Sequence, residues 1–355
     1  MTENITSLQS KVIDWLRFPM AAAVVLLHAG EISQGTYGPD FYSTLRIILS
    51  HGICRVAVPC FFFISGFLFF SKLDKWDWGI WYKKIGKRAR TLLLPYILWN
   101  LIALFVGCGY GWIRSRFNAS VEPMSLINLL RNNGWLNIFW ASTMNCPIDY
   151  PLWFIRDLIV IVAISPLIYL LIRYCKVWGL ATVFIICILT GSRDIEGFLF
   201  FAFGAYLRLF NKDFIEVFAK LKWPAYALCI IGLVAIALIY RRDLSLYNHI
   251  KTPFMVVGVI SVFNISSFLI SNDFTKNNDF LSSASFFIFA SHGILILHDI
   301  AHYFTLHFLP FKSVAGQCAV LFIKSAIAVC ICLAMYALLK RIMPKTLALL
   351  TGNRS

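Results

Sequence analysis

Charged residues are scarce in this chain. They make up 14% of its 355 residues, and Asp and Glu together number only 17. A soluble protein of this length needs a largely charged or polar surface, so the scarcity excludes an ordinary soluble enzyme. Hydrophobic residues instead account for 59% of the chain, and the mean hydropathy is +0.75. The composition predicts a polytopic integral membrane protein with an all-α fold.

Two common functional motifs are also absent. The ten cysteines include no Cys-x-x-Cys pair and lie mostly within apolar runs, which favours core packing over a metal site or a disulfide. Ser65 lacks the Gly-x-Ser-x-Gly turn that exposes a nucleophilic serine, so a small packing residue explains it better. We therefore expect neither a thiolate-bound metal nor a serine nucleophile.

No small-residue cleavage site follows the first apolar segment, so we expect this segment to remain as the first helix. Hydropathy predicts ten spans within a single membrane-embedded domain over residues 1–355. The predicted spans are 12–30, 47–70, 91–108, 152–172, 178–190, 195–210, 223–240, 252–271, 284–308 and 315–340. The fifth and sixth are short, which leaves them open to being tilted, broken or re-entrant.

Basic residues are distributed unevenly between the two sides of the predicted membrane domain. With both ends on one side, the loops and tails of that side hold seventeen Lys and Arg residues, and the opposite loops hold nine. The positive-inside rule then places both termini in the cytoplasm. The net charge of +15 mostly reflects this asymmetry and an attraction to anionic lipid, and no motif supports a nucleic-acid partner.

The first span carries titratable side chains where lipid would be expected. At about 100° and about 1.5 Å per residue, the eleven steps from Arg17 to His28 leave the two within roughly 20° of each other and about 16 Å apart along the axis. Asp14 lies near the start of the same face. Such groups are costly in a membrane, so they predict a functional cavity. Pro19 introduces an alternative, since a kink or a later helix start would shift the shared face.

Five basic residues precede the third span. They are Lys83, Lys84, Lys87, Arg88 and Arg90. One explanation is an anchor that sets the topology. The other is a cytoplasmic phosphate clamp, because guanidinium groups bind phosphate oxygens in bidentate fashion. Arg17 is predicted to lie at the same depth, which favours the clamp.

Two further pairs are candidates for substrate contacts. His51 and Arg55 are four residues apart, so on one helix face they either line the cavity or satisfy each other. Arg156 and Asp157 lie next to Trp153 at the mouth of the fourth span. An aromatic ring beside charged groups suits a sugar, although anchoring at the interface explains these residues equally well.

Three histidines of the ninth span, His292, His298 and His302, are possible metal ligands. Only His298 and His302 share a helix face, and Asp299 is the one carboxylate that accompanies them and His292. Because a metal site needs more ligands than this, no metal is expected.

Taken together, the motifs resemble the membrane-bound acyltransferase 3 family, the bacterial O-acyltransferases that modify surface and exported glycans. The similarity covers essentially the whole chain, and the order and spacing of its segments make it specific. These segments are Asp14-x-x-Arg17 with His28 ten residues later, 58–68, 87–90 before Leu94-Pro95-Tyr96, 152–157 and 285–292.

The resemblance implies acyl transfer from acyl-CoA, here acetyl-CoA, to a hydroxyl of a lipid-linked or exported glycan at a bacterial inner membrane. Such a transfer needs a site for the CoA phosphates and a base for the hydroxyl proton. Arg17, Arg88 and Arg90 are the candidates for the phosphates. His28 is the candidate base, since imidazole has the ordinary pKa nearest neutrality, and a covalent acyl carrier is its alternative role. The candidate acceptor-binding residues are His51, Arg55, Trp153, Arg156 and Asp157.

Some family members carry an appended soluble esterase-like domain, whereas this chain stops shortly after the tenth predicted span. Transfer is therefore expected to finish in the membrane domain or with a partner. The segment 109–150, with Trp112, Trp135 and Trp140, is the predicted external loop for acceptor selectivity.

A transporter or flippase for glycan precursors or acyl groups is the alternative function, because intramembrane His and Arg also line translocation paths. The lack of detectable inverted repeats argues against it. A scaffold without chemistry would leave Arg17 and His28 unexplained.

Overall fold

The structure is a computed structural model of the chain. It describes residues 6–31, 38–71, 73, 75–117, 134, 136, 138–141, 145–309, 311 and 313–353. Helices dominate these residues, and no β-strand occurs among them. The predicted all-α fold is confirmed.

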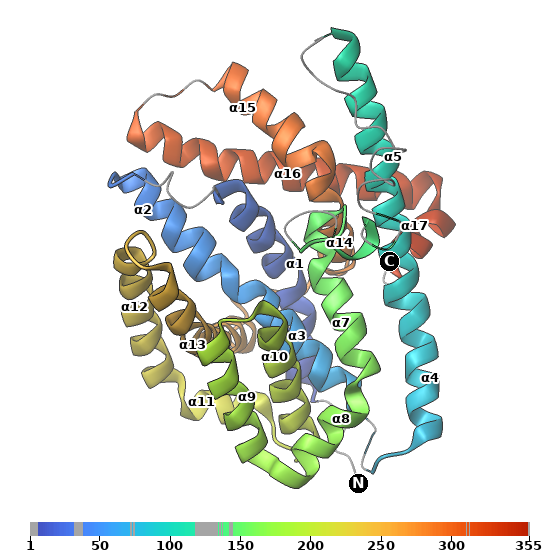
Figure 1. The fold of residues 1–355 in the computed structure, drawn as a ribbon, viewed down its shortest axis with the longest axis vertical. Coiled ribbons are helices and arrows are strands. Elements are labelled where there is room, and N and C mark those ends of the chain that lie inside the picture. Colours follow the sequence, from blue (N-terminus) through green and yellow to red (C-terminus); the bar gives the residue numbers. More distant parts are fainter. Residues whose placement is uncertain are drawn as a thin grey trace.

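Figure 1 shows the helices gathered into one bundle, with the α4 and α5 column along one side. The helices are α1 (Ser7–Gly30), α2 (Phe41–Ile47), α3 (Ala57–Phe69), α4 (Trp78–Arg88), α5 (Leu94–Phe117), α7 (Trp153–Ala163), α8 (Ser165–Leu170), α9 (Lys176–Thr190), α10 (Arg193–Leu209), α11 (Phe214–Lys220), α12 (Lys222–Ile239), α13 (Leu244–Ser271), α14 (Asp279–Ser291), α15 (His302–Phe308), α16 (Val314–Ile342) and α17 (Pro344–Thr351). Short 3₁₀ or π-helical turns join several of them, among these Ile48–Gly52, Ile53–Val56, Ala89–Leu93, Tyr150–Leu152, Leu171–Cys175 and His292–Ala301.

Within the described residues, eight helical segments are long and apolar enough to cross a membrane, so this is a multi-pass membrane protein. They are Ser7–Gly30, Phe41–Phe69, Trp78–Phe117, Ser165–Thr190, Lys222–Ile239, Leu244–Ser271, Asp279–Phe308 and Val314–Ile342. This count is lower than the ten predicted spans, because α7 and α10 have only 11 and 17 residues. The fourth predicted span is broken between α7 and α8. At Lys176 a positive φ of 50° turns the chain from the α8 leg into α9, and Figure 1 shows these as two legs of a V.

Helices extend into two of the predicted loops. The basic segment 72–90 contains α4, and α5 continues to Phe117, well into the segment that hydropathy assigned to an external loop. Hydropathy alone missed both because α4 is too polar to register as a span and the end of α5 carries Arg114 and Arg116. Most of the remainder of 109–150, including Trp135, lies outside the described residues.

Helix α1 is the central element of the site. Its first turn is closed by a capping box, in which the Thr6 hydroxyl accepts from the Gln9 amide and the Gln9 side chain accepts from the Thr6 amide. Pro19 lies inside α1, so it does not mark the start of the helix. The helix packs against α3, α13, α14 and α16, and this environment buries most of its apolar residues. Its C-terminal end, with His28, is thereby held inside the bundle.

The closest helix pair, α3 and α10, fixes the opposite wall of the site. A Cβ atom on Gly66 would overlap the carbonyl oxygen of Phe201, and one on Gly204 would overlap that of Phe63. Glycine at both positions therefore lets the two backbones approach directly, as small residues do in membrane helix pairs. This contact holds the N-terminal end of α10, with Arg193 and Glu196, at a fixed place beside the start of α3.

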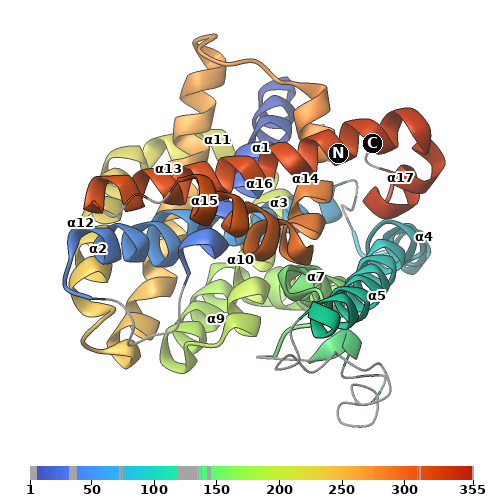
Figure 2. The ribbon, with the colours of Figure 1, turned by 90° about the horizontal axis from the view of Figure 1, so that it is seen from above.

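The predicted ninth span is not one straight helix. Between α14 and α15, Ile294 has ψ 90° and Leu295 has φ 61°, so the chain leaves helical geometry inside the turn His292–Ala301. This turn and α15 pack against α16, and Figures 1 and 2 both place α15 beside that helix. The break brings His298 back toward the end of α1.

Candidate active site

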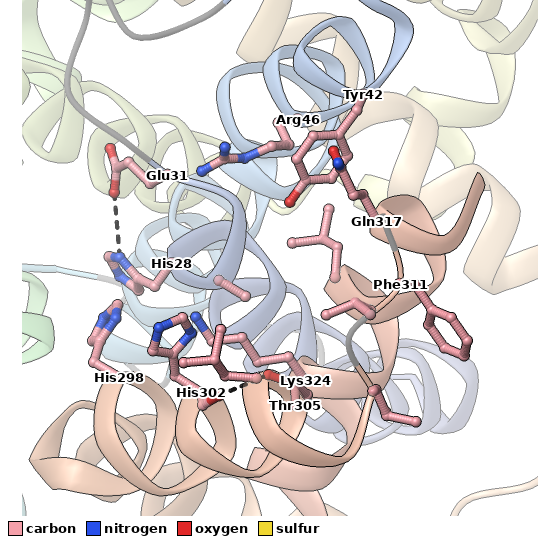
Figure 3. Close-up of a pocket in the computed structure, with 15 residues that line it drawn as sticks. His28, Glu31, Tyr42, Arg46, His298, His302, Thr305, Phe311, Gln317 and Lys324 are labelled. Atoms are coloured by element: carbon pink, nitrogen blue, oxygen red, sulfur yellow. Dashed lines mark hydrogen bonds and ion pairs between the residues drawn. The ribbon is translucent and has the colours of Figure 1, made fainter. Parts of the chain in front are cut away.

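Two cavities meet at the C-terminal end of α1. The first, called here the Lys324 cavity, has a volume of about 570 Å³ and is drawn in Figure 3. The second, called the Arg193 cavity, has a volume of about 830 Å³. His28, Glu31 and His298 line both of them. A group at this junction can therefore contact ligands that arrive from two directions.

The polar centre of the junction is an ion-paired chain from His28 to Arg55. The His28 Nδ1 atom lies 3.3 Å from Glu31 Oε2, and Arg55 Nη1 lies 3.7 Å from Glu31 Oε1. Burial alone would raise the pKa of Glu31, but the hydrogen bond and charge of His28 and the charge of Arg55 lower it to about 2. Glu31 is thus a carboxylate at neutral pH, and it can hold a proton on Nδ1 and leave Nε2 of His28 as the basic nitrogen.

Aromatic and histidine rings surround this pair. The Tyr150 ring meets the His28 ring edge-on at 4.9 Å, and the buried His292 ring stacks on it at 5.5 Å. The Tyr150 hydroxyl lies 3.1 Å from Nε2 of His298. Two segments that are distant from α1 in the sequence, Tyr150–Leu152 and His292–Ala301, therefore restrict the orientation of His28. They also place a phenol and a second imidazole beside it.

The far wall of the Arg193 cavity carries both basic and acidic side chains. The Arg193 guanidinium lies over the Trp153 ring at 4.4 Å. Glu196 accepts a hydrogen bond from the Thr252 hydroxyl at 3.1 Å and lies 4.0 Å from the Lys251 ammonium. Apolar residues complete the cavity, including Val58, Phe62, Phe200, Met255 and Phe289. This mixture of an apolar floor and a few fixed polar groups is typical of a binding site for an organic ligand.

Comparison with known proteins identifies the family of this chain. The family model described as an acyltransferase domain, that of acyltransferase 3, matches residues 11–337. The chain belongs to the acyltransferase 3 family. A similar protein is the succinoglycan biosynthesis protein ExoH of Rhizobium meliloti (strain 1021), which is 28% identical over 365 residues, covering 97% of this chain and 92% of ExoH. No solved structure matches the chain.

Three of the predicted site residues of this acyltransferase come together. His28, Arg55 and Trp153 all line the Arg193 cavity. His51 lies behind it, because its ring stacks at 3.9 Å on Tyr240, a residue of the cavity wall. Of the two predicted roles for the His51 and Arg55 pair, Arg55 thus lines the cavity and His51 supports its wall.

The three arginines predicted to bind the CoA phosphates do not line either cavity. Arg17 forms an ion pair of 3.2 Å with Asp14 on the same helix. Arg88 ends α4 and Arg90 lies in the following π-helical turn, and α4 packs against α7 rather than on the principal neighbours of α1. Among the described residues, no hydrogen bond or ion pair is formed by the side chain of Arg88 or Arg90. Their role in binding the donor stays a prediction.

Arg156 and Asp157 are buried beside the site and bind each other. Arg156 Nη2 lies 2.7 Å from Asp157 Oδ1, and Arg156 Nη1 donates to the carbonyl oxygens of Trp140 and Asn145. These contacts fasten the segment that leads to Tyr150 onto the first turn of α7, which carries Trp153. Direct contact of Arg156 and Asp157 with an acceptor stays a prediction, whereas the structure shows that Arg156 holds the segment before α7 in place.

Several residues of the junction were missed from the sequence. Glu31, Tyr150, Arg193 and Glu196 carry no motif of their own, and His298 was considered only as a metal ligand. Glu31 did have a signal, since it lies three residues after His28 and can reach it from the next turn. Glu196 also had one, because it is an acidic residue in a predicted span. In the described part of the chain, no three His, Cys, Asp or Glu residues are grouped to hold a metal ion.

Proposed function

We propose that this acyltransferase transfers an acyl group, most simply acetyl, from acyl-CoA to a hydroxyl of a lipid-linked or exported surface glycan. The observation that carries the proposal is the position of His28, which is paired with Glu31 and lines two cavities. A transfer between two substrates needs one base within reach of both. The name of ExoH, a polysaccharide biosynthesis protein, supports a glycan acceptor.

The geometry supports general-base catalysis. Glu31 holds the proton on Nδ1 of His28, and Nε2 accepts the proton of the acceptor hydroxyl as its oxygen bonds to the thioester carbonyl carbon. When the carbon–sulfur bond breaks, the imidazolium returns this proton to the leaving thiolate, so His28 ends the cycle neutral. Tyr150 lines the Arg193 cavity beside His28, and its hydroxyl is a donor of the kind that stabilises a developing oxyanion. The thioester supplies the activated acyl group, and the protein supplies position, base and charge.

The acceptor class is tested on the cell surface. A deletion strain and its parent are compared for the mass of the surface glycan and for its alkali-labile acyl groups. We expect the parent glycan to carry an ester that the deletion glycan lacks, with the same sugar backbone and amount. A deletion strain that exports no glycan, or that exports it fully esterified, would contradict the acyltransferase role. The first of these outcomes would favour the flippase hypothesis.

The topology is part of the proposal. We place both termini and α4 on the cytoplasmic side of a bacterial inner membrane, and the end of α5 on the outside, because the basic residues concentrate on the first side. Reporter fusions after Lys75 and after Phe117 should therefore be active in the cytoplasm and in the periplasm, respectively. The reverse result would exchange the donor and acceptor sides of the enzyme.

The donor phosphates are assigned to Arg88 and Arg90. Replacing both with Ala should weaken acetyl-CoA binding about 10-fold or more, because each charge-assisted contact is worth about 1.5 to 3 kcal/mol. Calorimetry on the purified protein measures this. Arg114→Ala and Arg116→Ala at the other end of the same helical column are the matched control and should leave the affinity unchanged. Equal affinity of the wild type and the Arg88 and Arg90 double variant would reduce this cluster to a topology signal.

A further inference from the structure

The Lys324 cavity has an excess of positive charge that its partner cavity lacks. Among the described residues that line it, Arg46 and Lys324 are basic and Glu31 alone is acidic, and Glu31 already pairs with His28 and Arg55. The Arg193 cavity is lined by Arg55 and Arg193 and by Glu31 and Glu196, so its charges balance. The two cavities share the same base but differ in the charge that they offer to a ligand.

Lys324 is the unusual member. It lies in the first half of α16, one of the most apolar helices, and its side chain is only partly exposed. Figure 3 shows the side chain among the residues that line the cavity, which also include Arg46 and His298. Among the described residues no carboxylate forms an ion pair with it. An ammonium in such a place is costly unless something of opposite charge joins it.

Arg46 lines another side of the Lys324 cavity. It lies on the short helix α2, donates from Nε to the carbonyl oxygen of Gly30 at 2.8 Å, and stands 5.3 Å from the Tyr42 ring centre. These contacts fix its guanidinium against the end of α1, close to His28 and Glu31. Two like charges on different helices therefore face one cavity, an arrangement that a bound anion would stabilise.

We propose that the Lys324 cavity binds an oxyanion of the glycan acceptor, a phosphate or a carboxylate, and so brings a neighbouring hydroxyl to His28. The volume of about 570 Å³ suits one or two sugar units with such a group. His302, Thr305 and Gln317 line the same space and offer polar groups to the sugar. The inference rests on the proposed function for the identity of the ligand, and it adds that the acceptor is anionic.

The test measures binding without turnover, so it is separate from the test of the transferase activity. Purified full-length protein in nanodiscs is titrated with two matched pairs of probes. One pair is a glucose tetrasaccharide and the same tetrasaccharide with one glucuronate, and the other is geraniol and geranyl diphosphate. We expect at least one anionic probe to bind about 10-fold or more tightly than its neutral partner, and the pair that shows this identifies the source of the oxyanion. The preference should shrink as salt is raised.

Variants locate the effect. Lys324→Gln and Arg46→Gln should each remove most of the preference for the anion and leave the affinity for the neutral probe unchanged, and Lys324→Arg should retain it. Lys340→Gln, on the same helix but outside the cavity, is the control and should behave as the wild type.

Equal affinities for charged and neutral probes in the wild type would overturn the proposal, whatever the variants do. It would also be overturned by a preference that survives in the Lys324 and Arg46 double variant, or by variants that lose acetyl-CoA affinity instead, which would assign the cavity to the donor. If the anion binds as expected but the glycan of the deletion strain is still fully esterified, the proposed function is refuted and this site is not.

Discussion

His28→Gln is expected to reduce acyl transfer by about 10² to 10⁴ fold, the contribution that a general base typically makes. Glutamine keeps much of the volume of histidine and can still form hydrogen bonds, but its amide cannot accept a proton at neutral pH. The loss should appear in kcat, because the two cavities that meet at residue 28 keep their other lining residues. The measurement is the rate of ester formation on the glycan in membranes that contain equal amounts of each variant.

The control separates loss of the base from damage to the fold. His307→Gln, an exposed position on α15, should retain full activity. Acetyl-CoA affinity and membrane abundance should be the same in His28→Gln as in the wild type, and His28→Ala should be equally inactive. Full activity of His28→Gln would refute the role of general base and bring the transporter hypothesis forward.

The sequence was sufficient for the class of protein and for the central residue. Long apolar runs can cross a bilayer as helices however they pack against each other, so the all-α membrane fold follows from composition. His28 stands out because a titratable side chain inside a membrane span costs free energy, so its presence indicates a function. Arg55 follows from its spacing of four residues from His51, which puts both on one helix face. The spacing of Arg17 and His28 could be computed because α1 is one helix, with Pro19 inside it.

The rest of the site depends on contacts between distant segments. Tyr150 and His298 are 148 residues apart, and they meet only because the chain leaves helical geometry at Ile294 and Leu295. A positive φ at a leucine carries no sequence signal, since this conformation is paid for by tertiary packing. Hydropathy likewise indicates how deep Arg88 and Arg90 lie in the membrane, but not which helices lie beside them. It could not say that their helix packs against α7 and not beside α1.

Glu31→Gln is expected to lower kcat about 100-fold with little change in acetyl-CoA affinity. The carboxylate lies 3.3 Å from Nδ1 of His28, so in the wild type it selects the tautomer with a free Nε2 and stabilises the imidazolium that forms during transfer. A glutamine can turn its NH₂ group toward Nδ1, which favours the opposite tautomer, and it offers no negative charge. Glu31→Asp keeps the charge but shortens the reach, so an intermediate rate is expected. Glu216→Gln, at an exposed site on α11, should have no effect.

The double variant decides whether His28 and Glu31 act as one unit. If the carboxylate works only through the imidazole, adding Glu31→Gln to His28→Gln should cause almost no further loss, because the group that Glu31 orients is already gone. If Glu31 acts independently, for example through Arg55 on the wall of the Arg193 cavity, the two losses should multiply to about 10⁴ fold or more. Rates of glycan esterification for the four members of the cycle, at equal membrane abundance, distinguish these cases. We expect the first, since Glu31 is closer to His28 than to Arg55 and its hydrogen bond to His28 contributes more to its low pKa.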